Sequence, residues 1–341
     1  MSGGPSYRMT DVSLPETAHF GPAVMDRLSA TLRAPIRDLV ARPSKRIRAR
    51  MVEIGYALAG VREEREPASP LEAMRIGALA DALEAIHSGS LIVDDIQDNS
   101  AERRGEPCLH HTLGSPLALN AGNTLYFWPF EWIRRLELPE SLELKLYRMM
   151  HATLFRAHLG QALDLGAAID AVEQSLVPSL CLAAIELKTG ELMSLALGAG
   201  ATLAGAEPER LATILSFGRR FGMALQMSDD LGNLSLPRGA SKRMEDLRLL
   251  RPTWAWAFAA ANSTEDVYKQ FVLAARALPD DAPMELWLRE QDFKTRARSA
   301  VAEHAHESLT SLRAHLVRPK RYGRALAALD QAFECIATSY G

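Results

Sequence analysis

The sequence predicts an all-α fold, and three observations favour it. From about residue 23 onward, apolar residues recur at three- and four-residue spacing, which is the period of one helix face. The helix formers Ala, Leu, Arg and Glu dominate these stretches. No sustained alternation of apolar and polar residues, the pattern typical of strands, occurs anywhere in the sequence.

The order of elements follows from the turn-forming residues. Residues 1–20 mix Gly, Pro, Ser and charged residues, which predicts a flexible N-terminal arm. No linker divides the remainder, so we expect one domain over residues 21–341. Pro and Gly interrupt it at residues 67–70, 105–107, 114–116, 205–208, 237–239 and 279–283, leaving segments long enough for helices of several turns.

Two segments are expected to be central helices of a large bundle. Residues 83–93 and 211–225 carry apolar residues on more than one face, whereas a surface helix carries them on one. The core of a helical bundle is also where side chains from facing helices can build a metal site.

Composition excludes several classes of partner and compartment. A net charge of -3 argues against nucleic acid, because binding phosphates along a strand needs excess Lys and Arg. The three cysteines, Cys108, Cys181 and Cys335, are too few and too scattered for a disulfide framework or a zinc site. We expect a cytoplasmic protein without a transmembrane segment, since the uncharged run 192–206 is shorter than the roughly 18 apolar residues of a span.

Two clusters of acidic residues carry the functional prediction. The first contains Asp94, Asp95 and Asp98, and the second contains Asp229 and Asp230 followed by Asn233. Residues four apart on a helix project from the same face, so Asp94 and Asp98 can reach one site. Each cluster follows a largely apolar stretch, where uncompensated negative charge is costly.

The ligand type predicts which cation compensates this charge. Carboxylates without His or Cys suit a hard ion, and Mg²⁺ prefers one or two carboxylates together with substrate phosphate oxygens and water. Two such clusters across a cavity would bind a diphosphate through Mg²⁺. The alternative, a solvated acidic face or a helix cap, is harder to reconcile with two clusters that each follow an apolar run.

Basic residues occur where a second anion would need them. They are Lys45, Arg46 and Arg48, then His87 two turns before Asp94, then Arg103 and Arg104, and finally Lys188, Lys242 and Arg243. Taken singly, each is more often a solvated surface charge. Their spacing relative to the aspartates is what makes them candidates.

These residues carry a family resemblance. The run from His87 to Gly105 resembles the first aspartate-rich motif of trans-isoprenyl diphosphate synthases, and most of all that of eukaryotic geranylgeranyl diphosphate synthases. Other landmarks follow in the family's order, namely ProSerLysArgIleArg, GlyGlnAlaLeuAsp at 160–164, LysThrGly at 188–190, LeuGlnMetSerAspAsp ending at Asp230, and GluAspLeuArg at 245–248. The resemblance implies the isoprenoid synthase bundle with a central apolar cavity, and a homodimer.

The resemblance also implies a reaction and a role for each residue. The reaction is head-to-tail condensation of isopentenyl diphosphate with dimethylallyl, geranyl or farnesyl diphosphate to give geranylgeranyl diphosphate. Asp94, Asp98 and Asp229 would bind Mg²⁺, supported by Asp95 and Asp230. Arg103, Lys188 and Lys242 would hold the allylic diphosphate, and Lys45, Arg48, His87 and Arg104 isopentenyl diphosphate. Thr189 and Gln226 would line the path of the carbocation.

Product length should follow the depth of the cavity. Gly89 and Ser90 are small where short-chain members of the family tend to place an aromatic ring. Tyr126, Phe127 and His158 resemble the residues at the floor of the pocket in the fungal enzymes. The alternative for Tyr126 and Phe127 is that they simply fill the core.

Departures from the family leave two questions open. Ser44 replaces a usual glycine, Arg251 a frequent lysine, and the loop 234–241 is about one residue short, so Arg243 could serve in place of Lys242. The rival functions are a class I terpene cyclase and a non-catalytic partner subunit. A cyclase would not need the second set of basic residues, and an inactive partner would be expected to lose its aspartates.

Overall fold

The computed structural model describes residues 20–59, 69–237, 243–316 and 322–338. Apart from one two-stranded ribbon, the regular structure of these residues is helical, which confirms the predicted all-α class. Residues 1–19, which make up nearly all of the predicted arm, and Lys242 lie outside the described residues. The chain forms two compact units, and the expectation of a single domain stays a prediction.

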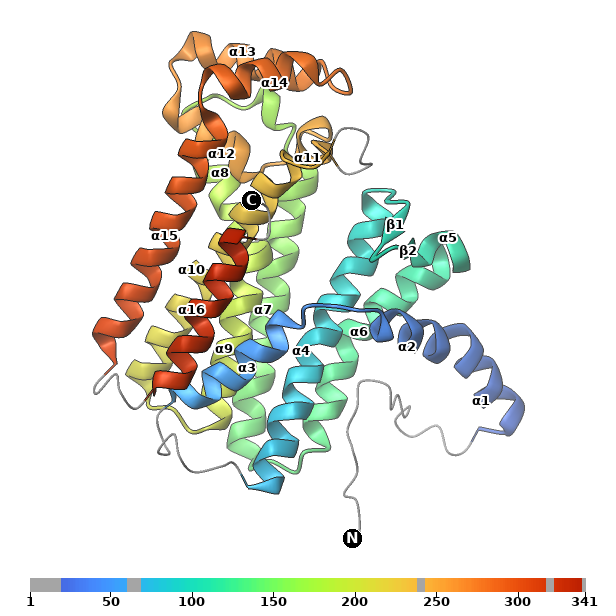
Figure 1. Ribbon diagram of the computed structural model, residues 1–341. Coiled ribbons are helices and arrows are strands. Elements are labelled where there is room, and N and C mark those ends of the chain that lie inside the picture. The colour runs from blue at the N-terminus through green and yellow to red at the C-terminus, as the bar shows by residue number, and fades with distance from the viewer. Residues whose placement is uncertain (1–19, 60–68, 238–242, 317–321, 339–341) are drawn as a thin grey trace. The chain divides into compact units, whose positions relative to one another are not determined.

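Unit 1 takes the described residues within 1–57, 61–148 and 199–205. Its elements are α1 (Pro22–Leu28), the π-turn η1 (Ser29–Arg33), α2 (Ala34–Ala41), α3 (Ile47–Leu58), α4 (Pro70–Gln97), β1 (Glu102–Arg103), β2 (Glu106–Pro107), α5 (Leu109–Leu113), α6 (Ser115–Arg134) and the start of α7 (Glu140–Gly166) (Figure 1). The strands β1 and β2 pair antiparallel and form a short hairpin directly after α4.

Helix α4 is the central element of unit 1. It begins at a capping box, in which the Ser69 hydroxyl accepts from the Glu72 backbone N–H and the Glu72 carboxylate accepts from the Ser69 N–H, with Pro70 at the first helical position. Leu79, Leu83 and Ile86 are fully buried on it. Helix α6 runs along α4 and adds further buried apolar side chains (Figure 1).

Helix α4 is also the one described helix that is long and apolar enough to cross a membrane. However, 61% of its most apolar window is buried inside the protein. Glu84 and Asp95 are charged residues buried on the same helix. This combination is typical of a core helix in a globular protein.

Unit 2 takes the described residues within 58–60, 149–198 and 206–341. Its elements are the remainder of α7, the 3₁₀ turn η2 (Ile169–Ala171), α8 (Val177–Ile185), the π-turn η3 (Glu186–Gly190), α9 (Glu191–Leu203), whose last residues belong to unit 1, α10 (Pro208–Asn233), α11 (Glu245–Arg248), α12 (Trp254–Asn262), α13 (Glu265–Arg276), α14 (Ala282–Glu290), α15 (Phe293–His315) and α16 (Gly323–Thr338).

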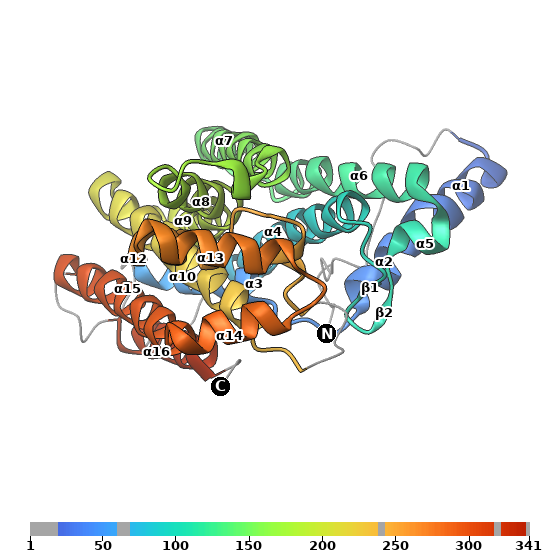
Figure 2. The same ribbon diagram turned by 90° about the horizontal axis from the view of Figure 1, so that it is seen from above.

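An aromatic cluster forms much of the core of unit 2. The rings of Trp256 and Phe271 meet edge to face with centroids 4.8 Å apart, and Trp287 and Phe293 pack around them. This cluster joins α12, α13, α14 and α15, and α15 packs in turn against α10 (Figure 2). The long helix α10 is thereby held along its length, which positions the residues at its C-terminal end.

Candidate active site

The first aspartate cluster lies at the C-terminal end of α4. Asp94 and Asp95 are in its last turn and Asp98 is its C-cap, with the Asp98 N–H donating to the Asp94 carbonyl at 2.8 Å. The helix dipole disfavours negative charge at this end. Three carboxylates placed there therefore indicate that a cation compensates them in the working protein.

The three carboxylates of this cluster have different surroundings. Asp95 is 3% exposed and forms an ion pair with Arg103 of β1, whose Nε donates to Oδ1 at 2.9 Å. Burial alone would lower the pKa of Arg103, but the hydrogen bond and charge of Asp95, together with Asp94, raise it above its usual value. Asp94 and Asp98 are only partly buried. Asp95 thus fixes the hairpin, while Asp94 and Asp98 are the more exposed carboxylates of the cluster.

The predicted cationic residues of unit 1 gather around His87. Burial, and then the charges of Arg48, Arg104 and Arg103, hold the pKa of His87 well below its usual range. Nδ1 of His87 is buried and has no hydrogen-bond partner within the described part of the chain. Three guanidinium groups around a neutral imidazole make a place that favours an anion. Lys45, on the loop before α3, is exposed.

The second aspartate cluster repeats the arrangement of the first at the end of α10. Asp229 is exposed, whereas Asp230 is 5% exposed and accepts from the Gln226 amide at 2.8 Å and from the Trp254 backbone N–H at 2.7 Å. Burial, and then the nearby charge of Asp246, raise the pKa of Asp230 to about 8. Again the first aspartate is the more exposed one and the second is held within its own unit.

The other predicted residues of unit 2 lie beside Asp230 or on the adjoining π-turn. The Thr189 hydroxyl donates to Gln226 Oε1 at 2.8 Å, which places Thr189, Gln226 and Asp230 in one chain of hydrogen bonds. Lys188 pairs with Asp164, Nζ to Oδ2 at 2.9 Å. Lys188 and Thr189 lie on η3, and such π-turns, which insert one residue into a helix, are frequent at functional sites.

Arg243 has a structural role in unit 2. Its guanidinium pairs with both Asp281 and Glu285, its Nε donates to the Leu236 carbonyl at 2.9 Å, and its side chain is 9% exposed. The suggestion that Arg243 could replace Lys242 as a diphosphate ligand does not fit these contacts. The role of Lys242 itself stays a prediction, because it lies outside the described residues.

The candidate chain-length residues are not all placed as expected. A Cβ added to Gly89 would lie 2.8 Å from the Gly122 carbonyl oxygen, so the position faces α6 and a ring there would not enter open space. Phe127 is 72% exposed in the single chain, which rules out the interpretation that it fills the core. Tyr126 is partly buried, and burial and the charge of Asp94 raise its pKa. Ser90 donates to the His87 carbonyl at 2.8 Å, and His158 is exposed.

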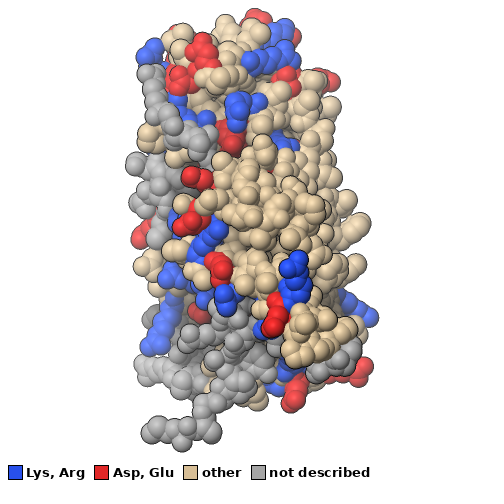
Figure 3. Space-filling view, turned by 90° about the vertical axis from the view of Figure 1, so that its right-hand side faces the viewer, with Lys and Arg blue, Asp and Glu red and all other residues tan. Residues whose placement is uncertain are grey.

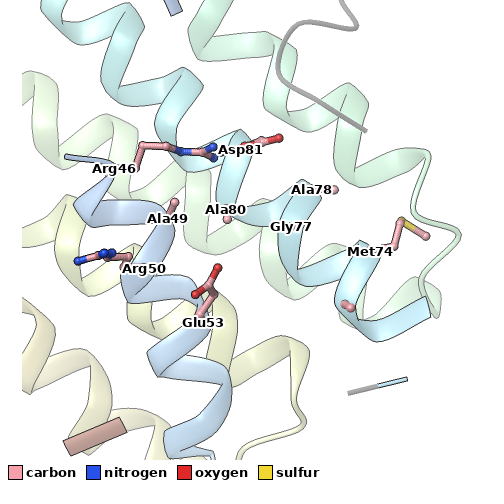
Figure 4. Close-up of a pocket in the computed structure, with 10 residues that line it drawn as sticks. Arg46, Ala49, Arg50, Glu53, Met74, Gly77, Ala78, Ala80 and Asp81 are labelled. Atoms are coloured by element: carbon pink, nitrogen blue, oxygen red, sulfur yellow. Dashed lines mark hydrogen bonds and ion pairs between the residues drawn. The ribbon is translucent and has the colours of Figure 1, made fainter. Parts of the chain in front are cut away.

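A pocket of about 590 Å³ lies between α3 and α4, and Arg46 is the one candidate basic residue among those that line it (Figure 4). Arg46 reaches from the α3 side toward Asp81 of α4 and pairs with it. Sequence reasoning missed Asp81 and also Glu84, one turn further along α4. Glu84 could have been found from the sequence, because it is an acidic residue inside the apolar run that precedes His87.

The donor set fits magnesium. Among the described residues no group of three or more His, Cys, Asp or Glu side chains is assembled for a metal. Asp94 and Asp98 provide two carboxylates at one helix end, and Asp229 provides a third at another. An ion at either helix end would take its remaining ligands from diphosphate and water, as Mg²⁺ does with substrates.

An all-α fold with aspartate pairs near the C-terminal ends of two long helices has the type of ligand that binds a diphosphate through a hard cation. The family model described as polyprenyl synthetase matches residues 29–281. The chain belongs to this family, which confirms the resemblance drawn from its motifs.

Relatives of known name agree with this assignment. The short chain isoprenyl diphosphate synthase of Methanothermobacter thermautotrophicus is 36% identical over 154 residues, which are 45% of this chain and 46% of that protein. The geranylgeranyl pyrophosphate synthase of the fungus Eremothecium gossypii is 28% identical over 208 residues, 60% of this chain and 61% of that protein. The matches to these two span about half to three fifths of the relatives' length.

Solved structures support the fold. The geranylgeranyl pyrophosphate synthetase of Pyrococcus horikoshii superimposes with a TM-score of 0.71 at 24% identity, covering 92% of this chain and 94% of that one. A synthase from Corynebacterium glutamicum, complexed with isoprenyl diphosphate and magnesium, gives 0.74 at 21% identity, covering 93% and 92%. The predicted isoprenoid synthase bundle is therefore confirmed.

Proposed function

We propose that the protein is a trans-prenyltransferase that condenses isopentenyl diphosphate with an allylic diphosphate to give geranylgeranyl diphosphate and pyrophosphate. One observation carries the proposal. Two long helices each end in an aspartate pair whose second member is buried and hydrogen-bonded, while the first is more exposed. The names of the archaeal and fungal relatives support the same reaction.

Magnesium, when bound, neutralises the diphosphate and stabilises the charge that develops as the allylic C–O bond breaks. We propose that Asp94, Asp98 and Asp229 hold it. Asp95 and Asp230 would act indirectly, since each is already hydrogen-bonded within its unit.

The basic residues divide between the two substrates in this proposal. Arg103 and Lys188, with Lys242, hold the allylic diphosphate, and the pairing of each of the first two with a carboxylate keeps its side chain in place. His87, Arg48 and Arg104, with Lys45, hold isopentenyl diphosphate. His87 is neutral at pH 7 and would bind an oxygen through a ring N–H.

Thr189 and Gln226 line the path of the cation with oxygen atoms. Their hydrogen bond leaves the hydroxyl oxygen of Thr189 as an acceptor. Oxygen dipoles aimed at developing positive charge lower its energy without providing a nucleophile as strong as water. The pyrophosphate that leaves would take the final proton.

A homodimer is part of the proposal. Three large apolar side chains on α6 are exposed, namely Leu117, Leu119 and Phe127. Exposed apolar side chains that gather on one surface are typical of an interface with another protein. Figure 3 shows a broad uncharged area beside a band of charged side chains. We expect light scattering to give twice the chain mass, and Phe127→Glu to lower it toward the monomer. A wild-type monomer would contradict this part.

The test of the reaction is product analysis. The purified protein is incubated with Mg²⁺, isopentenyl diphosphate and dimethylallyl, geranyl or farnesyl diphosphate in turn, and the products are sized. We expect a C20 allylic diphosphate that forms only when isopentenyl diphosphate is present. A cyclic hydrocarbon formed without it would instead identify a cyclase, and no turnover with any primer would identify a non-catalytic partner.

A further inference from the structure

Glu84 is a buried carboxylate that none of the predicted roles uses. It lies on α4 one turn before His87 and is 3% exposed. A carboxylate removed from water is costly unless hydrogen bonds or opposite charge compensate it. The contacts that compensate Glu84 therefore indicate what it does.

The first contact is with the start of α3. Oε1 of Glu84 accepts from the Ala49 backbone N–H at 3.0 Å. Ala49 is in the first turn of α3, where backbone N–H groups have no partner within the helix, and Arg50 is the first residue whose N–H bonds back, to Arg46. Glu84 thus supplies the partner that the helix itself cannot supply, and its charge suits the positive end of the helix dipole.

The junction before α3 needs such support. Arg46 has a φ of 46°, in the left-handed region that non-glycine residues seldom adopt. Asp81 pairs with the side chain of Arg46 (Figure 4). Glu84 accepts from the backbone N–H of Ala49, three residues further along the chain. Lys45 and Arg48 flank Arg46 in the chain, so their positions depend on the same turn.

The second contact is electrostatic and involves Arg104. Burial lowers the pKa of Arg104, the Glu84 carboxylate raises it, and Arg103 and Arg42 lower it, with a net lowering. Glu84 is thus the carboxylate that favours the charged form of a guanidinium crowded by other arginines. The hydrogen bond to Ala49 is thus the contact by which Glu84 acts on the turn that carries Lys45 and Arg48, and its charge also favours a charged Arg104.

We propose that Glu84 is a positioning residue for the cationic pocket, holding the first turn of α3 so that Lys45 and Arg48 converge with Arg104 beside His87 on one diphosphate. This inference rests on the proposed function, which assigns these residues to isopentenyl diphosphate. Glu84 itself would not touch the substrate.

Removing Glu84 should change diphosphate binding in opposite directions, depending on whether its charge or its contact with α3 matters more. Loss of a negative charge beside an anion site should, by Coulomb attraction alone, strengthen binding of the diphosphate. Loss of the positioning contact should weaken it. Glu84→Ala removes both the charge and the contact, whereas Glu84→Gln removes the charge and keeps an oxygen that can accept from Ala49.

The experiment measures KM for each substrate, kcat, the melting temperature, and binding of isopentenyl diphosphate by calorimetry. For Glu84→Ala we expect KM for isopentenyl diphosphate to rise about ten-fold, as for the loss of one charge-assisted hydrogen bond. KM for the allylic substrate should stay within about two-fold, and Glu84→Gln should recover most of the loss. Should Glu84→Ala fail to fold, Glu84→Gln should still bind isopentenyl diphosphate nearly as the wild type does.

Asp81→Asn is the matched control. It removes a carboxylate from the same helix, but the partner of Asp81 is the half-exposed Arg46 side chain and not the backbone of α3. Because such an exposed ion pair contributes little, KM for isopentenyl diphosphate should change by about two-fold at most. Tighter or unchanged binding in Glu84→Ala, a parallel rise of both KM values, or Glu84→Gln as impaired as Glu84→Ala would overturn the inference. A wild-type protein that forms no condensation product would instead overturn the proposed function, and the inference with it.

Discussion

A Cβ atom added to Gly89 of α4 would lie 2.8 Å from the carbonyl oxygen of Gly122 on α6. The reverse is nearly as tight, since a Cβ on Gly122 would lie 3.2 Å from the Gly89 carbonyl oxygen and 3.0 Å from Val93. The backbones of the two helices therefore meet where neither has a side chain. Gly89 lies five residues before Asp94 on α4. The contact between the two helices therefore fixes the position of the aspartates relative to α6.

Gly89→Ala should therefore destabilise the protein by about 1–3 kcal/mol, the usual cost of overpacking a core. Gly77→Ala is the matched control on the same helix, because nothing lies within 4 Å of its Cβ position. It should be neutral or stabilise by up to about 1 kcal/mol, since alanine restricts the unfolded chain. Thermal unfolding measures both variants, and equal stability of Gly89→Ala and wild type would refute the crossing.

The open and buried aspartates of the first cluster should respond differently to substitution. Asp94→Asn and Asp98→Asn should lower kcat by about 10²-fold or more while the melting temperature holds or rises slightly, because each removes a charge that the helix dipole disfavours. Asp95→Asn should also cost about 2 kcal/mol of stability, since it removes the charge that the partly buried Arg103 pairs with. Steady-state kinetics and thermal unfolding on the three variants check this. Equal losses of stability in all three would contradict it.

His87 should make stability depend on pH. Its pKa in the folded protein is lowered below the unfolded value of about 6.5, so the unfolded state takes up a proton first as pH falls. The stabilisation is therefore complete above about pH 6.5 and is lost as pH falls toward the folded pKa. Melting temperatures between pH 7.5 and 5.5 should fall more steeply for wild type than for His87→Gln. Parallel curves for the two proteins would show that His87 titrates normally.

Substitution of Arg243 should affect mainly the stability of the protein, whereas substitution of Lys242 should affect mainly substrate binding. Arg243→Ala removes the largely buried guanidinium that pairs with both Asp281 and Glu285, and should cost about 2 kcal/mol with little change in KM. Lys242→Ala should raise KM for the allylic substrate and leave the melting temperature unchanged. Kinetics together with thermal unfolding distinguish them, and a normal melting temperature for Arg243→Ala would return it to the list of diphosphate ligands.

Much of the fold and site follows from local patterns in the sequence. The helical period predicts α4 and α10, and the capping residues Ser69 and Pro70 account for the start of α4. The aspartates are recognisable because negative charge at the end of an apolar helix needs a cation. The grouping of Arg48, Arg103 and Arg104 around His87 follows from the family's motif order.

Other features depend on packing between segments far apart in sequence. Gly89 is small because α6 passes against it, which the sequence of α4 alone does not reveal. From the sequence alone Arg243 resembles a substrate ligand. The fold brings Asp281 and Glu285, which are about 40 residues further along the chain, into ion pairs with it. The role of Glu84 becomes evident only when α3 is placed against α4.

The central claim is that both aspartate clusters hold one metal-bound diphosphate. The most direct test is the Mg²⁺-dependent affinity for a non-ionising allylic thiolodiphosphate, measured by calorimetry for Asp94→Ala, Asp229→Ala and the double variant. We expect each single variant to lose most of the Mg²⁺-dependent binding and the double variant to lose little more, since coupled residues are not additive. Losses that simply add, or binding that survives either substitution, would contradict the claim.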